Sequence, residues 1–393
     1  MTDLDSFALA YVPSNDKNDK NDENNANKEH FSVKVNINLW TQCGWDDETP
    51  VLDIGLMLSH LSDAKKIRLY LPFQVEKEDL EDLCECLSKD ANLLGAVFNE
   101  PYRSADVTSN SKKVEVMKEG DAKKTEFILY KLDFLSSNDV KLIPYKENKG
   151  TYLEFDPHFI KGTTNDVSCD QYYLRFRIRT PLLKECVREY KAPNRYFETL
   201  VNSTYMVDIR FNNTRSMERS LVQEMTAQDG WSLAPINGLH FLLMTKVDVD
   251  VDANFGSSRV LEKDIWDKYV NLSDKEKRKT EDIIAYHSSK KLQKDAMSVN
   301  EKGDIGSWEF FTRLKAGKCG PITIIPYALL LILLNVISNL TFNILLTILP
   351  QEALNGPSMY VQLEALMVLI TLFCIVLLSL NWKNLIAKLK KKH

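Results

Sequence analysis

The sequence predicts an α+β protein with a mostly antiparallel β-sheet body and a C-terminal two-helix transmembrane hairpin. Two observations lead to this prediction. Apolar and polar residues alternate in several short runs before residue 271, as they do in half-buried strands. Between Pro321 and Leu380 the chain carries only two charged residues, Glu352 and Glu364, whereas the part before it is charged throughout. We therefore expect a globular body followed by an apolar membrane segment.

Residues 1–30 are expected to be disordered, apart from one short apolar stretch. The tract from Ser14 to Glu29 has too few apolar residues to bury a core. Phe7–Val12 is apolar enough to dock on the body or on a partner. Asp3 and Asp5 stand where a secretory signal would carry positive charge, which argues against export by a cleaved signal.

The body itself, a sensing or regulatory unit, is predicted over residues 31–271. Its clearest strand begins at Phe31, where apolar residues alternate with Ser, Lys and Asn as far as Leu39. A helical stretch is expected at Glu76–Leu87. The other main strands are predicted at Val51–Leu58, Tyr172–Arg179, Tyr205–Asn212 and Leu239–Asp252.

Residues 272–318 are predicted to form a helical stalk. Leu272–Gly303 is rich in Lys, Glu and Asp and poor in large apolar residues, as in an exposed helix. Trp308, Phe310 and Phe311 then alternate with charged residues, which favours a short helix at a membrane interface.

Two apolar runs, 322–349 and 359–382, are predicted to be the transmembrane helices. The first would span about 42 Å as a helix, more than the roughly 30 Å of a hydrocarbon core. Lysines follow the second run in the tail 383–393, and the short loop between the runs has no Lys or Arg. The asymmetry of basic residues places both ends in the cytosol, with the bacterial inner membrane as the expected location.

Polar residues inside these runs raise two alternatives. Amide side chains in hydrocarbon need partners, so they would either line a pore or join helices together. Two helices cannot enclose a pore, and we therefore expect a homo-oligomer in the lipid bilayer. The candidate pore-lining residues are Asn335, Ser338, Asn339, Asn343, Thr347 and Glu364.

A basic stripe is the candidate ligand site of the body. Alternation in the strand Tyr172–Arg179 places its arginines on one face, and two more follow in and after the strand Tyr205–Asn212. Guanidinium groups bind phosphates through paired hydrogen bonds, so the stripe predicts a nucleotide or oligonucleotide ligand. The residues are Arg175, Arg177, Arg179, Arg210 and Arg215.

A purely structural alternative competes with this interpretation. Asp248, Asp250 and Asp252 alternate with valines and offer an acidic face that could pair with the arginines in a cross-strand ladder. The same aspartates are a weaker candidate for Ca²⁺, because strand spacing differs from the loop geometry that Ca²⁺ sites use.

Motifs for catalysis are missing from the sequence. It contains no phosphate-binding glycine loop, no dinucleotide fingerprint, no Gly-x-Ser-x-Gly and no His-Glu-x-x-His. Seven scattered cysteines form no metal-type cluster and fit a reducing compartment. We expect no enzyme activity, no cofactor and no metal site, although residues far apart in sequence could still assemble a tethered enzyme.

The predicted architecture resembles the two-helix membrane effectors of bacterial anti-phage systems, such as the Hailong type. The resemblance covers the apolar hairpin and the large body, with Asp53-Ile54-Gly55, Leu71-Pro72-Phe73 and Phe98-Asn99-Glu100 similar to runs in bacterial membrane proteins. It implies an oligomeric ion channel or pore that is gated by a nucleotide signal or a protein bound to the body, with a nucleotidyltransferase as partner. A membrane-tethered scaffold or sensor, in which the hairpin is a simple anchor, is the alternative.

Overall fold

The computed structural model consists of two compact units, Met1–Gly317 and Lys318–His393. The first unit is the β-rich body, and the second contains the helix α7 (Pro321–Ile348). The structure describes residues 5–14, 30–41, 49–116, 125–135, 139–146, 149–162, 169–190, 202–253, 255–270, 280–291, 304–317 and 321–348.

Ten strands of the described part of the body form its largest sheet, in the order β17-β18-β15-β2-β3-β11-β8-β7-β6, with β5 paired to β11. Most neighbours are antiparallel, but β2 runs parallel to β15 and β8 parallel to β11. The strands are β2 (Ser32–Trp40), β3 (Val51–Ser59), β5 (Leu80–Asp82), β6 (Tyr102–Asp106), β7 (Ser111–Val116), β8 (Thr125–Tyr130), β11 (Gln171–Ile178), β15 (Ile236–Lys246), β17 (Ser257–Val260) and β18 (Ile283–Lys291).

Two smaller sheets complete the strands that the structure describes. One has the order β14 (Ser232–Leu233), β1 (Ala8–Pro13), β4 (Ala64–Leu71), β10 (Gly150–Phe155) and β9 (Val140–Tyr145). The other has the order β12 (Val187–Tyr190), β13 (Asn202–Phe211), β19 (Trp308–Gly317) and β16 (Val249–Asp252). β13 shows why these segments are strands, since buried and half-buried residues alternate along its whole length and bury one face.

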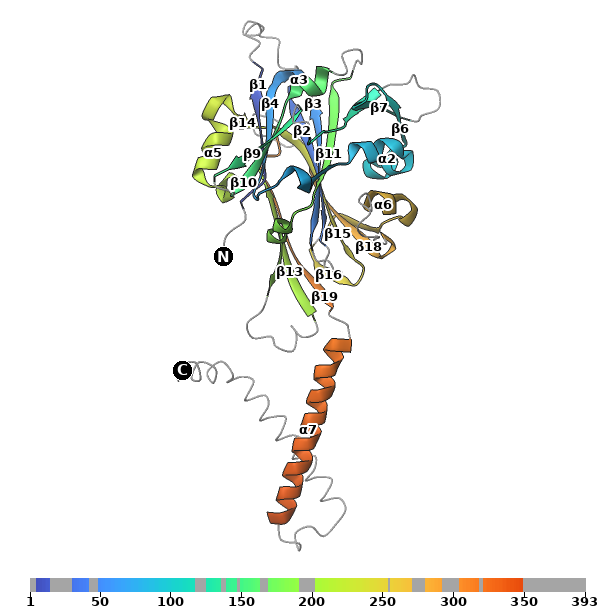
Figure 1. Cartoon of the computed structure of the whole chain (residues 1–393), viewed down its shortest axis with the longest axis vertical. Coiled ribbons are helices and arrows are strands. Elements are labelled where there is room, and N and C mark those ends of the chain that lie inside the picture. The colour runs from blue at the N-terminus through green and yellow to red at the C-terminus, as the bar shows by residue number, and fades with distance from the viewer. Residues whose placement is uncertain are drawn as a thin grey trace. The chain divides into compact units, whose positions relative to one another are not determined.

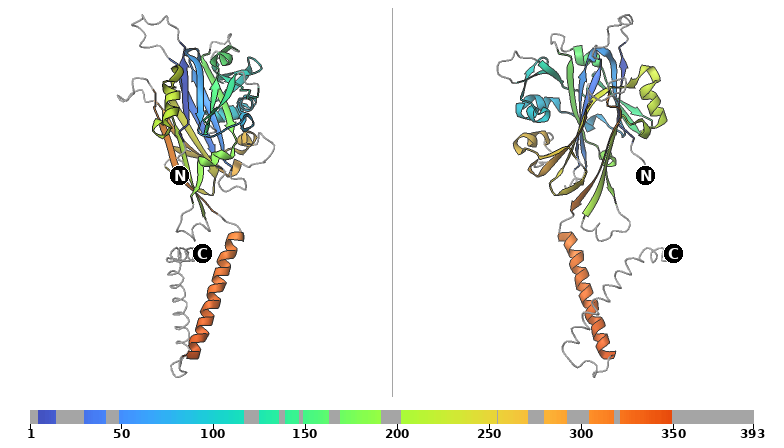
Figure 2. Two further views of the ribbon diagram at one scale, coloured as in Figure 1. Left: turned by 60° about the vertical axis from the view of Figure 1, so that its left-hand side comes forward. Right: turned by 180° about the vertical axis from the view of Figure 1, so that it is seen from behind.

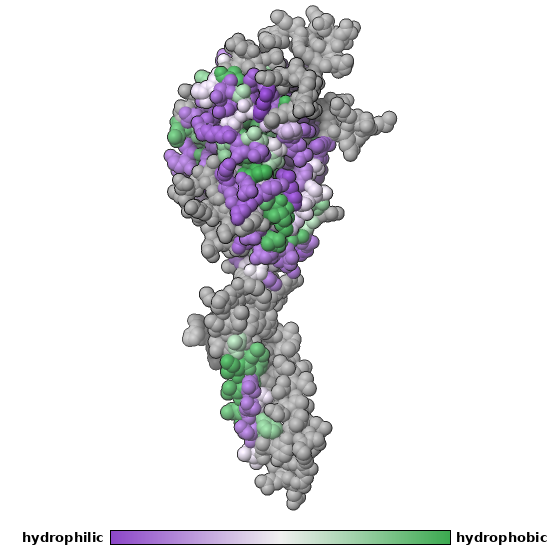
Figure 3. Space-filling view, turned by 90° about the vertical axis from the view of Figure 1, so that its right-hand side faces the viewer, coloured by the Kyte–Doolittle hydropathy of each residue, from purple (hydrophilic) through white to green (hydrophobic). Residues whose placement is uncertain are grey.

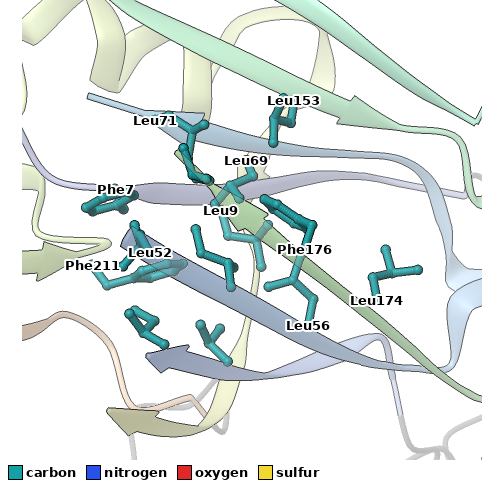
Figure 4. Packing of buried hydrophobic residues seen from close by; sticks show 14 of the residues in the cluster. Phe7, Leu9, Leu52, Leu56, Leu69, Leu71, Leu153, Leu174, Phe176 and Phe211 are labelled. Atoms are coloured by element: carbon teal, nitrogen blue, oxygen red, sulfur yellow. The ribbon is translucent and has the colours of Figure 1, made fainter. Parts of the chain in front are cut away.

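One apolar core joins the three sheets. Leu56 and Phe176 come from the ten-stranded sheet, Leu69 and Leu153 from the five-stranded sheet, and Phe211 from the four-stranded sheet, and all are fully buried. Figure 4 shows these side chains meeting between the strands. The ten-stranded sheet therefore forms one wall of the core, and the two smaller sheets form the other.

Short helices cover the outer faces of two sheets. α1 (Cys84–Lys89), α2 (Ala91–Phe98) and α6 (Lys263–Val270) pack on the ten-stranded sheet around a second apolar cluster. α5 (Arg219–Thr226) packs on the five-stranded sheet, so α2 and α6 lie on one side of the body and α5 on the other (Figures 1 and 2). Among the described residues, the body also has the helix α3 (Pro157–Gly162) and 3-10 turns at Leu61–Asp63, Lys77–Asp79, Pro181–Glu185, Thr214–Ser216, Gln228–Gly230 and Thr280–Asp282.

The strand β1 lies within the segment 1–30 for which the sequence predicts disorder. It pairs with both β4 and β14, and Leu9 is completely buried. The apolar stretch Phe7–Val12 thus docks on the body, which is one of the two outcomes expected for it. Residues 15–29 lie outside the described residues.

The predicted α+β fold class is wrong. Strands make up about half of the residues that the structure describes, and helices are few and short in the described body, so the fold is mostly β. The helical prediction at Glu76–Leu87 overlaps a 3-10 turn, the strand β5 and only the beginning of α1.

The predicted transmembrane hairpin is also wrong. Among the residues that the structure describes, none of the helices has the length and hydropathy that a bilayer span requires. The prediction used freedom from charge as its criterion, but uncharged polar residues such as Asn335, Asn339 and Asn343 interrupt the apolar run. The finding contradicts the location in the bacterial inner membrane and the description as a transmembrane channel. The second predicted helix, 359–382, and the tail 383–393 lie outside the described residues.

The region predicted to be a helical stalk contains two strands instead. β18 is part of the ten-stranded sheet, and the expected interfacial helix is β19 in the four-stranded sheet. In β19 the buried residues Thr312, Leu314 and Ala316 alternate with exposed Arg313 and Lys315, which is the period of a strand. The aromatic and charged composition had obscured this alternation.

Candidate functional site

Arg175 and Arg177 of the predicted basic stripe belong to a buried polar network beneath α6. Because side chains alternate along β11, Tyr173, Arg175 and Arg177 point away from the apolar core and toward α1, α2 and α6. Opposite them, β3 contributes Asp53 and α6 contributes Tyr269. We call these five residues the buried arginine network.

Asp53 is the anionic centre of this network. Arg177 donates to both carboxylate oxygens of Asp53, from Nε to Oδ1 at 2.6 Å and from Nη2 to Oδ2 at 3.1 Å. Trp40 Nε1 and Tyr269 Oη donate to Oδ2 at 2.9 and 2.8 Å. Burial alone would raise the pKa of Asp53, but the charge and hydrogen bonds of Arg177 hold it below its ordinary value. Asp53 is therefore ionised at neutral pH.

Arg175 forms hydrogen bonds with neutral hydroxyls, and its charge also interacts with the Asp53 carboxylate. Its Nε donates to Tyr269 Oη and its Nη1 to Tyr173 Oη, both at 2.8 Å. Arg175 and Arg177 are 2% and 1% exposed, so neither side chain reaches solvent. The network holds two guanidinium groups and one carboxylate, and tyrosine hydroxyls solvate the second cation.

The network fixes the end of α6 as well as the Tyr269 side chain. Arg177 Nη1 donates to the backbone carbonyl oxygens of Tyr269 at 3.1 Å and Val270 at 3.5 Å. Carbonyls at a helix C-terminus lack partners within the helix and favour a nearby cation. The position of α6 therefore depends on Arg177.

Gly55 makes room for this arrangement on the neighbouring strand. A Cβ at position 55 would lie 2.2 Å from Tyr173 Oη. Any other residue would displace the hydroxyl that accepts from Arg175, so the Asp53-Ile54-Gly55 run supplies both an anion and the space for its neighbours.

A groove of about 440 Å³ lies on the outer side of α6. α2, the chain after it and the edge strand β17 form the other walls. We call it the α2–α6 groove. Its described lining residues are Ala91, Asn92, Gly95, Ala96, Asn99, Glu100, Pro101, Tyr102, Arg259, Glu262 and Ile265.

Small side chains and two ion pairs shape the groove, since Arg259 Nη1 also lies 3.9 Å from Glu262 Oε1. Ala91, Gly95 and Ala96 keep the wall of α2 low, and Lys268 on α6 binds Asp90 before α2 at 3.1 Å. Arg259 Nη2 donates to the carbonyl oxygen of Ala96 at 3.4 Å and leaves 46% of its side chain exposed. The guanidinium thus stands at the rim, where a ligand can reach it.

The α2–α6 groove offers several polar groups that can bind a ligand. It offers a guanidinium, two carboxylates, two asparagine amides and the Tyr102 ring. Among its described lining residues there is no histidine, cysteine or serine that could form a nucleophile–base pair. Across the whole described part of the chain, no group of three or more His, Cys, Asp and Glu residues is arranged to hold a metal.

The structure does not bring the five predicted arginines together. Arg175 and Arg177 are in the buried arginine network, and Arg179 is half-buried, 3.5 Å from Glu81. Arg210 lies on β13 of the four-stranded sheet, paired with Asp208 at 2.6 Å, and Arg215 is exposed in the turn after it. No bound molecule tests them as ligand residues, so that assignment stays a prediction, and the burial of two of them weighs against it.

The acidic face predicted as their alternative partner pairs elsewhere. The strand β15 ends before these aspartates, and the chain then forms β16, which joins the four-stranded sheet beside β19. Asp252 forms an ion pair with Arg313 of β19. The acidic face therefore contributes a cross-strand ion pair, but to β19 and not to β11.

The predicted pore-lining residues of the first run lie on α7. Asn335, Asn339, Asn343 and Thr347 are exposed, whereas Ser338 is buried. Asn339 Nδ2 donates to Asn335 Oδ1 at 3.4 Å along the helix. Figure 3 shows hydrophilic side chains of α7 as a band beside hydrophobic ones. Glu364 lies outside the described residues, and pore lining is not tested.

No family model matches the chain, and no curated protein shows significant similarity to it.

Sequence reasoning missed the partners that define the site. Asp53 could have been identified from the sequence, because it is a single carboxylate inside the apolar run Val51–Leu58 and a buried charge needs a partner. Tyr269 and Arg259 could not, since their roles depend on where α6 and β17 return to the sheet.

Proposed function

We propose that this protein is a non-enzymatic regulatory protein whose body binds a nucleotide in the α2–α6 groove and signals through α6. One observation supports it above the others: α6 forms a wall of the groove with Ile265 and closes the buried arginine network with Tyr269. A ligand that shifts α6 by a small amount changes hydrogen bonds to two buried charges. Such an element has few intermediate positions and suits a two-state response.

The lining of the groove matches the parts of a nucleotide. Arg259 is an exposed guanidinium suited to a phosphate, and the Tyr102 ring offers a face to a base. Asn92 and Asn99 can hydrogen-bond base edges, and the two glutamates can accept from ribose hydroxyls. About 440 Å³ lies within the usual range of 300–1,000 Å³ for small-ligand sites.

The proposal retains one part of the resemblance to anti-phage effectors. Those systems pair an effector with a nucleotidyltransferase, which would supply the ligand proposed here. The channel activity is not part of the proposal.

Titration of the full chain with a nucleotide panel tests the proposal. Isothermal titration calorimetry with AMP, ATP, GTP and cyclic dinucleotides should find at least one ligand that binds with a micromolar dissociation constant. Arg259→Ala should weaken that binding at least tenfold, because a charge-assisted hydrogen bond contributes about 1.5–3 kcal/mol.

Arg313→Ala is the matched control for this variant. Arg313 is also an exposed arginine with a carboxylate partner, but it lies on β19 in another sheet. It should bind like the unchanged chain. Absence of binding by every nucleotide at millimolar concentration, or equal binding by Arg259→Ala, would contradict the proposal.

Hydrogen exchange locates the response. With the nucleotide bound, amides of α6 should exchange at a changed rate, while those of β13 and β19 should not. If a ligand bound without changing the exchange rates of α6, the proposed binding would hold but the proposed signalling through α6 would be wrong.

A further inference from the structure

Four basic side chains gather on the outer face of the ten-stranded sheet, the face on which α6 also packs. Lys34 of β2, Gly238 of β15 and Lys291 of β18 are direct cross-strand partners, so they form one row across three strands. His240 follows Gly238 by two residues on β15 and therefore points to the same face. His287 precedes Lys291 by four residues on β18 and does so too. We call Lys34, His240, His287 and Lys291 the lysine–histidine patch.

Gly238 places no side chain between the two lysines. Adjacent strands lie about 4.8 Å apart, so the α-carbons of Lys34 and Lys291 are separated by roughly 10 Å across the glycine. Lys34 Cγ lies 3.6 Å from the point where a Cβ of residue 238 would be, so the lysine stem leans over the glycine. Both lysines are exposed, and neither has a carboxylate partner among the residues that the structure describes. The two ammonium groups can therefore reach one anion held above Gly238.

The two histidines form a hydrogen-bonded pair beside the lysines. His240 Nδ1 and His287 Nε2 lie 3.2 Å apart, and the two rings are parallel. With one proton on each ring the pair is neutral, and one of these nitrogens donates while the other accepts. One additional proton would give the pair a positive charge and another N–H donor.

The charges that act on the histidine pair are all positive. They come from Lys34 and Lys291 for His240, and from Lys291 and Arg259 for His287. Burial, and then these neighbouring charges, lower the pKa of both histidines, that of His240 to about 4. The pair is therefore uncharged at pH 7 and would accept a proton if an anion offset its surroundings.

Described carboxylates on the neighbouring elements do not offset this charge. Three of them, on β3, after β17 and on α6, already accept hydrogen bonds from other residues: Asp53, Glu262 and Asp267. The other charged residues of α6 are exposed to solvent: Lys263, Asp264 and Lys268. The patch therefore has an excess of positive charge that an anion from outside can neutralise.

We propose that the lysine–histidine patch binds a phosphate monoester, with the two lysines holding the doubly charged phosphate and the histidine pair taking up a proton from solvent. Two ammonium groups match the charge of a dianion, and lysine binds phosphate as a compact point charge. The Ser289 hydroxyl, next to His240 across the strands, can supply a neutral hydrogen bond. No residue of the patch lines the α2–α6 groove, so this site is independent of the nucleotide proposed there.

A metal ion is the competing ligand of the same histidines. Neutral imidazoles bind transition metals, and two nitrogens 3.2 Å apart have the spacing of two ligands of Zn²⁺. The surrounding positive charges oppose a cation, however, and the described residues contain no group of three His, Cys, Asp and Glu that could hold one. The arrangement therefore favours an anion over a metal.

Titration of the full chain with sodium sulfate tests the site, with chloride keeping the ionic strength constant. Sulfate keeps both negative charges from about pH 5.5 to 7.5, so a change in its affinity over this range comes from the protein. The backbone amide signal of Gly238 in NMR spectra should shift with a millimolar dissociation constant. That constant should fall at least fivefold between pH 7.5 and 5.5, because uptake of one proton changes affinity by up to tenfold per pH unit.

Lys291→Gln and Lys290→Gln are a matched pair of variants. Lys291→Gln should weaken sulfate binding at least tenfold, because a charge-assisted hydrogen bond is lost. Lys290 is the adjacent residue of β18 but points to the opposite face, where it donates to the carbonyl oxygens of Ile305 and Ser307. Lys290→Gln should bind sulfate like the unchanged chain.

The double variant His240→Gln/His287→Gln tests the proton uptake. It keeps both lysines, so sulfate should still shift the Gly238 signal, but with a dissociation constant that no longer depends on pH. A pH dependence equal to that of the unchanged chain would show that the histidines do not take up the proton.

Two sources of the phosphate are distinguished by their probes. Glycerol 3-phosphate represents a soluble ester, and phosphatidylcholine vesicles that contain phosphatidic acid represent a lipid headgroup. Binding of either one, weakened by Lys291→Gln, supports the proposal and identifies the source. A chain that binds sulfate but neither ester would overturn the assignment to phosphate monoesters.

Two further results would overturn the anion site itself. One is a Gly238 signal that does not respond to sulfate at pH 5.5. The other is a response to Zn²⁺ that the double histidine variant removes, in a chain that does not respond to sulfate, which would assign the pair to a metal.

Discussion

The two faces of β11 lie in the same strand and are equally buried, but they are held in different ways. Leu174, Phe176 and Ile178 face the three-sheet core and belong to its apolar cluster. On the opposite face, Arg175 and Arg177 are just as inaccessible but are surrounded by a carboxylate and hydroxyls. Apolar packing tolerates small shifts, whereas a buried charge depends on each of its hydrogen bonds.

The difference between the two faces of β11 indicates where the body can respond to a ligand. The apolar face stabilises the three sheets against each other without a directional preference. The polar face ties α6 to β3 and β11 through a few directional bonds. We therefore expect substitutions on the apolar face to lower global stability and those on the polar face to release α6.

Asp53→Ala should have the largest effect. It leaves Arg177 buried without its anion, which typically costs about 3–5 kcal/mol of unfolding free energy. Urea unfolding of the full chain measures it. The triple variant Asp53→Leu/Arg175→Met/Arg177→Met should recover most of the loss, because apolar residues can replace a buried group of charges. A loss below about 1 kcal/mol for Asp53→Ala would show that the pair is not essential.

Leu174→Ala tests the apolar face of the same strand. Removing a fully buried leucine leaves a cavity and costs about 2–4 kcal/mol. Hydrogen exchange should show no selective opening of α6 in this variant. If α6 opened more than the sheets, the two faces would not be independent.

Tyr269→Phe should have a smaller and more local effect. The hydroxyl accepts from Arg175 and donates to Asp53, and losing it leaves both groups short of one partner, at about 1–3 kcal/mol. Amides of α6 should exchange faster while those of β13 do not change. Tyr286→Phe, on the half-exposed surface of β18, is the matched control.

The weakest expected effect is a pH dependence from the stacked pair His240 and His287. Burial, the neighbouring His287 and two lysines lower the pKa of His240 to about 4, and burial also lowers the pKa of His287. The unfolded chain protonates His240 near pH 6.5 and the folded chain only near pH 4, and the pKa of His287 shifts in the same direction. Stability therefore falls as the pH falls through this window, by less than about 1.4 kcal/mol per pH unit for each proton because solvent screens the pair.

His240→Gln should flatten this part of the stability curve in urea titrations at pH 4 to 7. Burial raises the pKa of Asp82 to about 7, which stabilises the fold as the pH falls and opposes the histidines. Asp82 is present in both proteins, so the difference between their curves isolates His240. Parallel curves would exclude the histidine pair as the source.

Local alternation was enough to predict individual strands of the body. The runs Phe31–Leu39 and Tyr172–Arg179 are found as β2 and β11 with ends shifted by one residue. The same rule applied to residues 308–316 would have found β19, but aromatic and charged composition was given more weight there. The long strand predicted at Leu239–Asp252 divides because the chain leaves one sheet for another after Lys246, which no local pattern reveals.

Less of the candidate site than of the fold could be predicted from the sequence. An alternating run of Arg and apolar residues is typical of a half-exposed strand, and only the return of α6 covers it. Arg177 is separated from Asp53 by 124 residues and from the backbone of Tyr269 by 92. The arginines could therefore be selected from the sequence, but their burial, their partners and the groove above them could not.

The position of β1 affects how the body is assembled during synthesis. Phe7 and Leu9 form backbone and side-chain hydrogen bonds with Arg210 and Asn212, some 200 residues later in the chain. At about 5–20 residues per second, a ribosome needs roughly 10–40 s to make that stretch. β4 is made soon after β1 and can pair with one of its edges, but the other edge, which pairs with β14, has no partner until that stretch is complete. The docking of β1 is therefore completed late in synthesis.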